Sequence, residues 1–201
     1  MRIYLASRSP RRRELLTQMG IAFDTVIFRD GSRADSETDE TPHPGEAPLA
    51  YVERVARAKA EHGSRILDWR KLPRHPLLSA DTTLEFNGEI IGKPFDATDA
   101  TAILRRLSGQ THRVLTGVAV NYQGRTEYVL SSSEVRFRPL DEEEIRQYVN
   151  SGEPMDKAGA YGIQGRAGMF VEYLAGSYTG VMGLPVCETG ELLKTLGFRP
   201  L

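Results

Sequence analysis

Short apolar strands alternate with amphipathic helices along this chain, and that alternation constrains its fold more than any other feature. Apolar or alternating runs predict strands at residues 3–6, 23–28, 77–80, 83–86, 89–91, 113–122, 126–137, 169–174 and 180–182. Helical periodicity predicts helices at residues 11–19, 49–62, 97–107, 185–196 and from 141 to about 152. Because both hairpins and helical crossovers join the strands, we expect an α/β protein with a mixed sheet.

Local signals set several of these boundaries. Ser9 followed by Pro10 is typical of a helix start, with serine as the N-cap and proline in the first turn. Asn87-Gly88 between two apolar segments indicates a tight hairpin. Gly63 predicts the end of the helix that begins at residue 49. Asp141 followed three residues later by Glu144 is typical of a capping box and predicts a helix start.

The composition excludes several classes of protein. The chain has 201 residues, 26 basic against 27 acidic side chains and 40% hydrophobic residues, as in ordinary globular proteins. This length fits one domain, residues 1–201, which can bury a sizeable core. The balance of charge argues against general nucleic-acid binding. No apolar run is long enough to predict a membrane-spanning helix.

Cys187 is the only cysteine, so no intrachain disulfide can form. Its apolar surroundings predict a core position rather than a nucleophile. The cysteine usage, and an N-terminal apolar run too short for a signal peptide, lead us to expect a cytoplasmic protein. The four histidines lack the spacing of metal-binding motifs, and we expect none of them to be catalytic: His43, His62, His75 and His112.

A group of arginines and serines surrounds the start of the first predicted helix. Its members are Ser7, Arg8, Ser9, Arg11, Arg12 and Arg13. The N-terminus of a helix already carries partial positive charge, so an anion would stabilise these cations. Backbone N–H groups, serine hydroxyls such as that of Ser7, and the guanidinium groups of Arg11 and Arg12 could together bind a phosphate. A solvated basic surface is the alternative.

An apolar strand at residues 77–80 leads directly to Asp81, which is followed by Thr82 and Thr83. In open α/β sheets, ligands bind beyond the carboxyl ends of the strands. A carboxylate at such an end could hold a divalent metal or accept a proton from water. The alternative is that Asp81 only begins a turn.

Two lysines and a group of acids are further candidates. Lys59 falls on the apolar stripe of its helix, where a lysine must extend to solvent, pair with an acid or meet a ligand. Lys93 follows the hairpin and is a candidate phosphate ligand. The long loop at residues 29–48 carries acids whose oxygen atoms suit Mg²⁺ or Mn²⁺, namely Asp35, Glu37, Asp39 and Glu40. A solvated acidic loop is the alternative.

Residues 152–165 form a glycine-rich segment. The glycines at positions 159, 162 and 165 indicate close backbone approach or a tight bend. The amide of Gln164 offers two donors and an acceptor, which is enough to read the edge of a base. A purely structural loop is the alternative.

Several of these segments occur together, and in this order, in one known family. They are residues 5–16, 57–60, 79–82, 92–94, 107–112 and 148–165. Over nearly its whole length the chain resembles the Maf family of nucleoside triphosphate pyrophosphatases. The resemblance implies an α/β fold like that of inosine triphosphatases, with a mixed, strongly bent sheet flanked by helices and two lobes around a central cleft.

The resemblance also implies an activity and a set of site residues. Family members hydrolyse a nucleoside triphosphate to the monophosphate and pyrophosphate with a divalent metal such as Mg²⁺ or Mn²⁺, often as homodimers. By resemblance, Asp81 is the catalytic residue and a metal ligand. The basic positions that bind phosphate fall on Arg11, Arg12, Lys59 and Lys93. The second metal position fits Glu40 best, with Glu37 and Asp39 as alternatives.

Three positions distinguish two branches of the family. Arg11, Thr82 and Gln164 resemble the dTTP/UTP branch. We therefore expect hydrolysis of dTTP and UTP, or of modified pyrimidine nucleotides, with a house-cleaning or division-related role. A 7-methyl-GTP pyrophosphatase of the sister branch and a non-enzymatic nucleotide-binding regulator of septum formation are the alternatives. We expect the nucleotide as partner, and neither nucleic acid nor a membrane.

Overall fold

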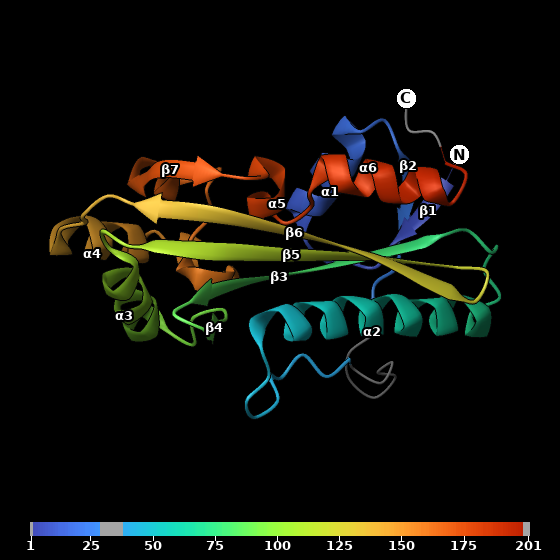
Figure 1. Ribbon diagram of the computed structural model, residues 1–201, viewed down its shortest axis with the longest axis horizontal. Coiled ribbons are helices and arrows are strands. Elements are labelled where there is room, and N and C mark those ends of the chain that lie inside the picture. Colours follow the sequence, from blue (N-terminus) through green and yellow to red (C-terminus); the bar gives the residue numbers. More distant parts are fainter. Residues whose placement is uncertain (1, 29–37, 199–201) are drawn as a thin grey trace.

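A seven-stranded mixed sheet runs through the molecule (Figure 1). The structure is a computed structural model that describes residues 2–28 and 38–198. The strands are β1 (Arg2–Leu5), β2 (Ala22–Thr25), β3 (Leu77–Phe86), β4 (Glu89–Ile91), β5 (Thr111–Tyr122), β6 (Arg125–Phe137) and β7 (Val171–Ala175). Their order is β2-β1-β3-β5-β6-β7, and β4 pairs with β3. The pairs of β1 with β2 and β3 are parallel and the other pairs are antiparallel, so the expected mixed sheet is confirmed.

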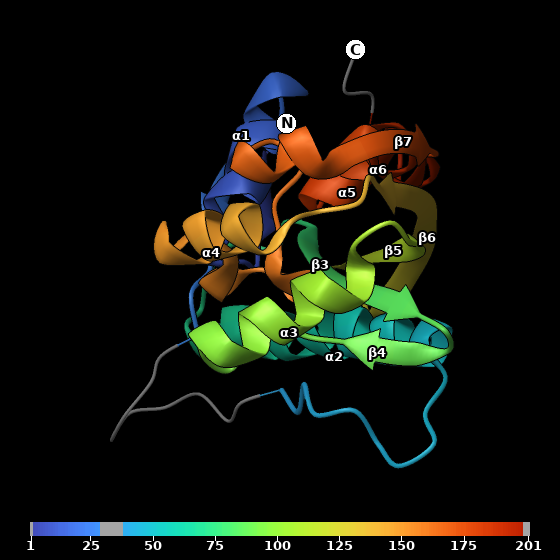
Figure 2. The same cartoon turned by 90° about the vertical axis from the view of Figure 1, so that its left-hand side faces the viewer.

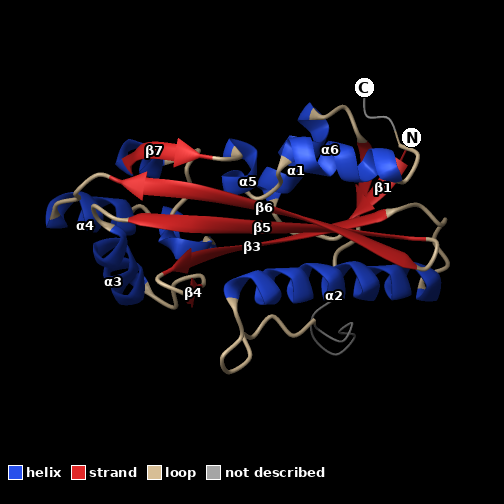
Figure 3. Ribbon diagram, viewed as in Figure 1, coloured by secondary structure: helices blue, strands red, loops and turns tan. Residues whose placement is uncertain are grey.

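Helices flank the sheet on both faces, as expected. The α-helices are α1 (Pro10–Gln18), α2 (Pro48–Trp69), α3 (Ala97–Leu107), α4 (Glu142–Asn150), α5 (Tyr178–Met182) and α6 (Val186–Thr195). Three short 3₁₀ helices follow α4: η2 (Glu153–Asp156), η3 (Ala158–Ala160) and η4 (Arg166–Phe170). The long helix α2 lies along one face, whereas α1, α5 and α6 lie on the other (Figures 2 and 3). Within the described ranges, none of the helices combines the length and apolar character needed to cross a membrane.

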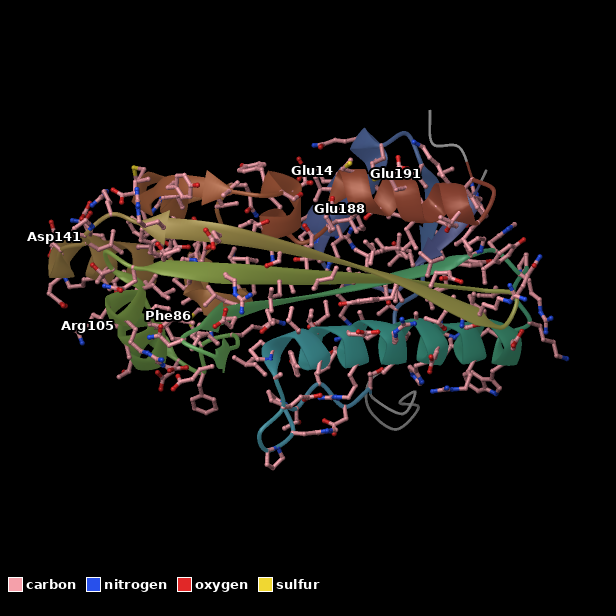
Figure 4. The ribbon with its side chains drawn as sticks, viewed as in Figure 1. Glu14, Phe86, Arg105, Asp141, Glu188 and Glu191 are labelled. Atoms are coloured by element: carbon pink, nitrogen blue, oxygen red, sulfur yellow. The ribbon has the colours of Figure 1, made fainter. Side chains whose placement is uncertain are left out.

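The hydrophobic core is divided along the long strands. One cluster lies where β3 to β6 meet α3 and α4, and it includes Leu84 and Phe137. A second lies beneath α1 and α6 and includes Ala80. Figure 4 labels residues near each cluster. Phe86, Arg105 and Asp141 lie toward α3 and α4, whereas Glu14, Glu188 and Glu191 lie on α1 and α6. The polar residues between Ala80 and Leu84 therefore lie between two apolar clusters.

Several predicted boundaries are confirmed. Ser9 is the N-cap of α1 with proline in the first turn. Asn87 and Gly88 adopt positive φ angles of 53° and 82° in the turn between β3 and β4. At α4, Asp141 and Glu144 form a capping box.

The end predicted for the helix at Gly63 is wrong. α2 continues through this residue to Trp69. A Cβ atom at position 63 would lie 2.7 Å from Cδ1 of Leu77, so glycine here allows the helix to pack closely on β3. The predicted break between two strands at residues 81 and 82 is also wrong, because β3 continues from Leu77 to Phe86.

Three predictions near the C-terminus need correction. Residues 180–182 lie in helix α5 rather than a strand, since the side chain of Ser177 accepts a hydrogen bond from the backbone N–H of Gly180 and caps the helix. Met169 lies in η4, so the last strand begins at Val171. Cys187 is exposed on α6 rather than buried in the core.

Candidate active site

Among the residues that the structure describes, the centre of β3 pairs with another strand along one edge only. Along one edge, β5 pairs with every residue from Leu77 to Glu85. Along the other edge, the pairing with β1 ends at Leu78 and the pairing with β4 begins at Leu84. Within the described residues, 79–83 therefore have no strand partner on that side, and we call them the open edge.

Two chain segments begin at the ends of this open edge. β1 ends beside Leu78 and leads to Ser7 and α1, whereas β4 ends beside Leu84 and leads to Lys93. The predicted position of Asp81 at the carboxyl end of a strand is wrong, and the strand ends at this edge are those of β1 and β4. Asp81 itself lies inside β3.

The glycine-rich segment reaches the same place. The backbone N–H of Gly159 donates to the carbonyl oxygen of Gly92 at 2.9 Å. Nη1 of Arg11 lies 3.6 Å from Oδ2 of Asp156. Segments after β1, after β4 and after α4 therefore converge on the open edge.

An acid–lysine–acid cluster lies on the α2 face of β3. Nζ of Lys59 lies 2.9 Å from Oδ1 of Asp81 and 2.8 Å from Oε2 of Glu40. Asp81 is buried, with 7% of its surface exposed. Of the alternatives for Lys59, the structure therefore shows pairing with acids.

A guanidinium group and hydroxyl groups lie on the opposite face. Arg12 donates from Nη2 to Oγ1 of Thr82 at 3.1 Å and from Nη1 to Oγ of Ser7 at 3.2 Å. Its Nε donates to the carbonyl oxygen of Gly183 at 2.8 Å, which ties α1 to the end of α5. Thr82 and Asp81 face opposite sides because successive side chains alternate along a strand.

The two faces share one electrostatic environment. Burial lowers the pKa of the Arg12 guanidinium from its ordinary value, and the negative charges of Asp81 and Glu40 oppose this change. The charge of Arg11 acts in the same direction as burial. A further anion near these two arginines would therefore be stabilised.

The two described acids proposed as metal ligands in the loop, Asp39 and Glu40, make different contacts. Glu40 reaches Lys59, whereas the carboxylate of Asp39 accepts a hydrogen bond from the backbone N–H of Thr41. Asp35 and Glu37 lie outside the described residues. Of the acids between residues 38 and 47, Glu40 is the one that contacts the Lys59–Asp81 pair.

Two predicted binding residues have exposed side chains. Lys93 is exposed at the end of β4, and its backbone position places it beside the open edge. Gln164 is exposed in the glycine-rich segment. Both side chains are accessible to a ligand.

The residues that are present suit a hard divalent cation. In the described part of the chain, histidines, cysteines and acids form no group of three or more that could hold a metal. Asp81 and Glu40 supply two carboxylates that share one ammonium group. Mg²⁺ is commonly held by one or two carboxylates together with substrate phosphates, so this pair fits such an ion.

Two residues of the site were not predicted from the sequence. Oγ1 of Thr116 on β5 lies 3.0 Å from Oγ1 of Thr82 and donates to the carbonyl oxygen of Gly180 at 2.7 Å. Asp156 pairs with Arg11. Thr116 interrupts the apolar run of β5 and could have been recognised from the sequence for that reason, but no sequence signal links Asp156 to a helix so far away in the chain.

The fold and the site define a mixed α/β protein with acids and cations gathered at an unpaired sheet edge. The chain belongs to the Maf-like protein family, whose family model matches residues 2–196. This confirms the family resemblance of the sequence.

Curated relatives match the chain over almost its full length. A dTTP/UTP pyrophosphatase of Dechloromonas aromatica (strain RCB) is 82% identical and covers 100% of both chains. A dTTP/UTP pyrophosphatase of Aromatoleum aromaticum is 64% identical over 98% of this chain and 96% of its own. The solved structure of the Staphylococcus aureus Ham1 protein is similar over 68% of this chain and 72% of its own, with 12% identity and a TM-score of 0.45.

Proposed function

We propose that this chain is a nucleoside triphosphate pyrophosphatase that hydrolyses dTTP and UTP to the monophosphate and pyrophosphate. Membership of the Maf-like family and the names of full-length relatives at 82% and 64% identity support this activity. The observation that carries the proposal in the structure is the Glu40–Lys59–Asp81 cluster beside Arg12 at the open edge.

The cationic residues neutralise the triphosphate. Arg11, Arg12 and Lys93 bind phosphate oxygens, and the hydroxyl of Ser7 and the N-terminus of α1 add donors. Lys59 contributes a further positive charge on the α2 face. This positive field allows a water molecule to approach the α-phosphorus.

Asp81 acts on the attacking water. Its buried carboxylate orients the water or accepts its proton, and pyrophosphate leaves from the α-phosphorus. A bound Mg²⁺ or Mn²⁺ would stabilise negative charge on the phosphates, and Asp81 and Glu40 would hold it. Lys59 holds both carboxylates close together before substrate binds.

Gln164 reads the base. Its amide can pair with both N3–H and O4 of uracil or thymine, which share this edge. Arg11 and Thr82 complete the set that resembles the dTTP/UTP branch. We further infer that residues 1–201 form one domain with two lobes, that the enzyme works in the cytoplasm and that it forms a homodimer.

A panel of common and modified nucleoside triphosphates tests the proposal. We expect pyrophosphate rather than orthophosphate from UTP and dTTP, dependence on added Mg²⁺ or Mn²⁺, and ¹⁸O from labelled water in the monophosphate. A preference for 7-methyl-GTP would assign the chain to the sister branch. Nucleotide binding without any hydrolysis would support a regulator instead.

A further inference from the structure

Residues 38–47, the described segment that carries Glu40, contain neither helix nor strand. They lead into α2. Backbone groups in such a segment need partners from elsewhere if they are to stay in one conformation. Here the partners come from the first two turns of α2, where Tyr51 and Arg54 lie.

Tyr51 and Arg54 bind three consecutive backbone carbonyl groups. Arg54 donates from Nη1 to the carbonyl oxygen of Asp39 at 3.0 Å and from Nη2 to that of Thr41 at 2.9 Å. The hydroxyl of Tyr51 donates to the carbonyl oxygen of Glu40 at 2.9 Å. The backbone is thus held at Glu40 and on both sides of it.

Arg54 is itself fixed by an acid from the same segment. Its Nε and Nη2 donate to the two carboxylate oxygens of Glu46 at 2.6 and 2.8 Å, which forms a bidentate pair. These hydrogen bonds lower the pKa of Glu46 to about 2. Glu46 therefore stays charged at neutral pH and keeps the guanidinium oriented.

Glu40 needs this support because its side chain is long and 55% of it is exposed. Holding an exposed glutamate in one rotamer costs conformational entropy. Its carboxylate nevertheless reaches Nζ of Lys59 at 2.8 Å. Tyr51 shares the environment of these carboxylates. Its pKa is raised to about 12, first by burial and then by the negative charges of Asp81 and Glu40.

We propose that Arg54 and Tyr51 are positioning residues that hold Glu40 against Lys59 and so preform the acidic half of the metal site. The proposal rests on the function proposed above, in which Glu40 binds the metal. It adds two residues of α2 that touch neither metal nor substrate.

The substitution Arg54→Lys tests this inference, with Arg57→Lys as its matched control. Arg57 lies on the same helix, but it donates to Glu53 and to the carbonyl oxygen of Thr126, which both lie outside residues 38–47. Lysine keeps the charge but cannot form the same fork of hydrogen bonds. Mn²⁺ binding is measured by water-proton relaxation with a UTP analogue that cannot be cleaved between its α- and β-phosphates.

We expect Arg54→Lys to weaken Mn²⁺ binding roughly 10- to 100-fold, as is usual when a partner of a metal ligand is lost. Tyr51→Phe, which removes one hydrogen bond, should weaken it less. Arg57→Lys should leave it unchanged. Equal effects of Arg54→Lys and Arg57→Lys would overturn the proposal.

A double-substitution cycle shows whether Arg54 acts through Glu40. In a Glu40→Gln background, Arg54→Lys should add no further loss of Mn²⁺ binding, because its target is already gone. An additive loss would contradict the proposal.

Amide hydrogen exchange separates the two proposals. Exchange in residues 38–47 should become faster in Arg54→Lys and stay unchanged in Arg57→Lys, whatever the substrate proves to be. If the unsubstituted protein released no pyrophosphate, the proposed function would fail while this readout still tested the contacts. An active enzyme with unchanged exchange and Mn²⁺ binding in Arg54→Lys would refute the positioning role alone.

Discussion

The two faces of β3 differ at its centre, although Asp81 and Thr82 are neighbours in the chain. On the α2 face, Asp81 and Glu40 both contact the ammonium group of Lys59. On the opposite face, Thr82 accepts a hydrogen bond from Arg12. Adjacent residues of one strand thus contact acids and a lysine on one face and a guanidinium group on the other. In the proposed function, the α2 face governs kcat and the other face governs KM.

The largest effect is expected for Asp81→Asn. The amide cannot take a proton from water, so kcat should fall roughly 10²- to 10⁴-fold. UTP binding should remain, because Arg11, Arg12 and Lys93 are untouched. Pyrophosphate release and calorimetric titration with UTP measure the two quantities. Unchanged turnover would refute the role of Asp81.

Arg12→Lys tests the opposite face. Lysine keeps the positive charge but loses the planar set of bonds to Ser7, Thr82 and Gly183. We expect KM for UTP to rise about 10- to 100-fold, with a smaller change in kcat. Arg2→Lys is the control, since Arg2 is an exposed arginine paired with Asp24. A fall in kcat with KM unchanged would break the distinction between the faces.

Gln164→Ala should alter base preference more than chemistry. Losing neutral hydrogen bonds to the base should reduce kcat/KM for UTP relative to CTP by up to about tenfold. The exposed position of Gln164 predicts an unchanged Tm. Equal losses for every nucleotide would count against a role in reading the base.

Thr82→Val should have the smallest effect. Oγ1 of Thr82 lies 3.1 Å from Nη2 of Arg12 and 3.0 Å from Oγ1 of Thr116, and valine removes both interactions at nearly constant volume. Because Arg12 keeps its other two bonds, we expect KM to rise only about two- to fivefold. A loss of kcat comparable with that of Asp81→Asn would show that the two faces are not functionally distinct.

Local chemistry made much of the fold predictable. Asn87-Gly88, the Asp141–Glu144 capping box and Ser9-Pro10 each act within a few residues, so the sequence contains the whole signal. The apolar stripe of α2 likewise indicated that Lys59 points inward. Pairing with Glu40 and Asp81 explains how that position is satisfied.

Features that depend on distant residues could not be predicted in this way. Gly63 is typical of a helix end, but here glycine lets α2 pack closely on the side chain of Leu77, which lies far away in the sequence. The polar residues 81 and 82 are typical of a strand end. In the structure both pair with β5, so β3 continues beyond them. The open edge itself follows from where β1 and β4 stop, which no local pattern shows.

A crystal structure with Mg²⁺ and a UTP analogue that cannot be cleaved between its α- and β-phosphates tests the central claim most directly. The account predicts that the triphosphate lies along residues 79–83, with the α-phosphorus nearest Asp81 and with Arg12 and Lys93 on its oxygens. An analogue bound elsewhere on the molecule, or with its γ-phosphorus nearest Asp81, would contradict it.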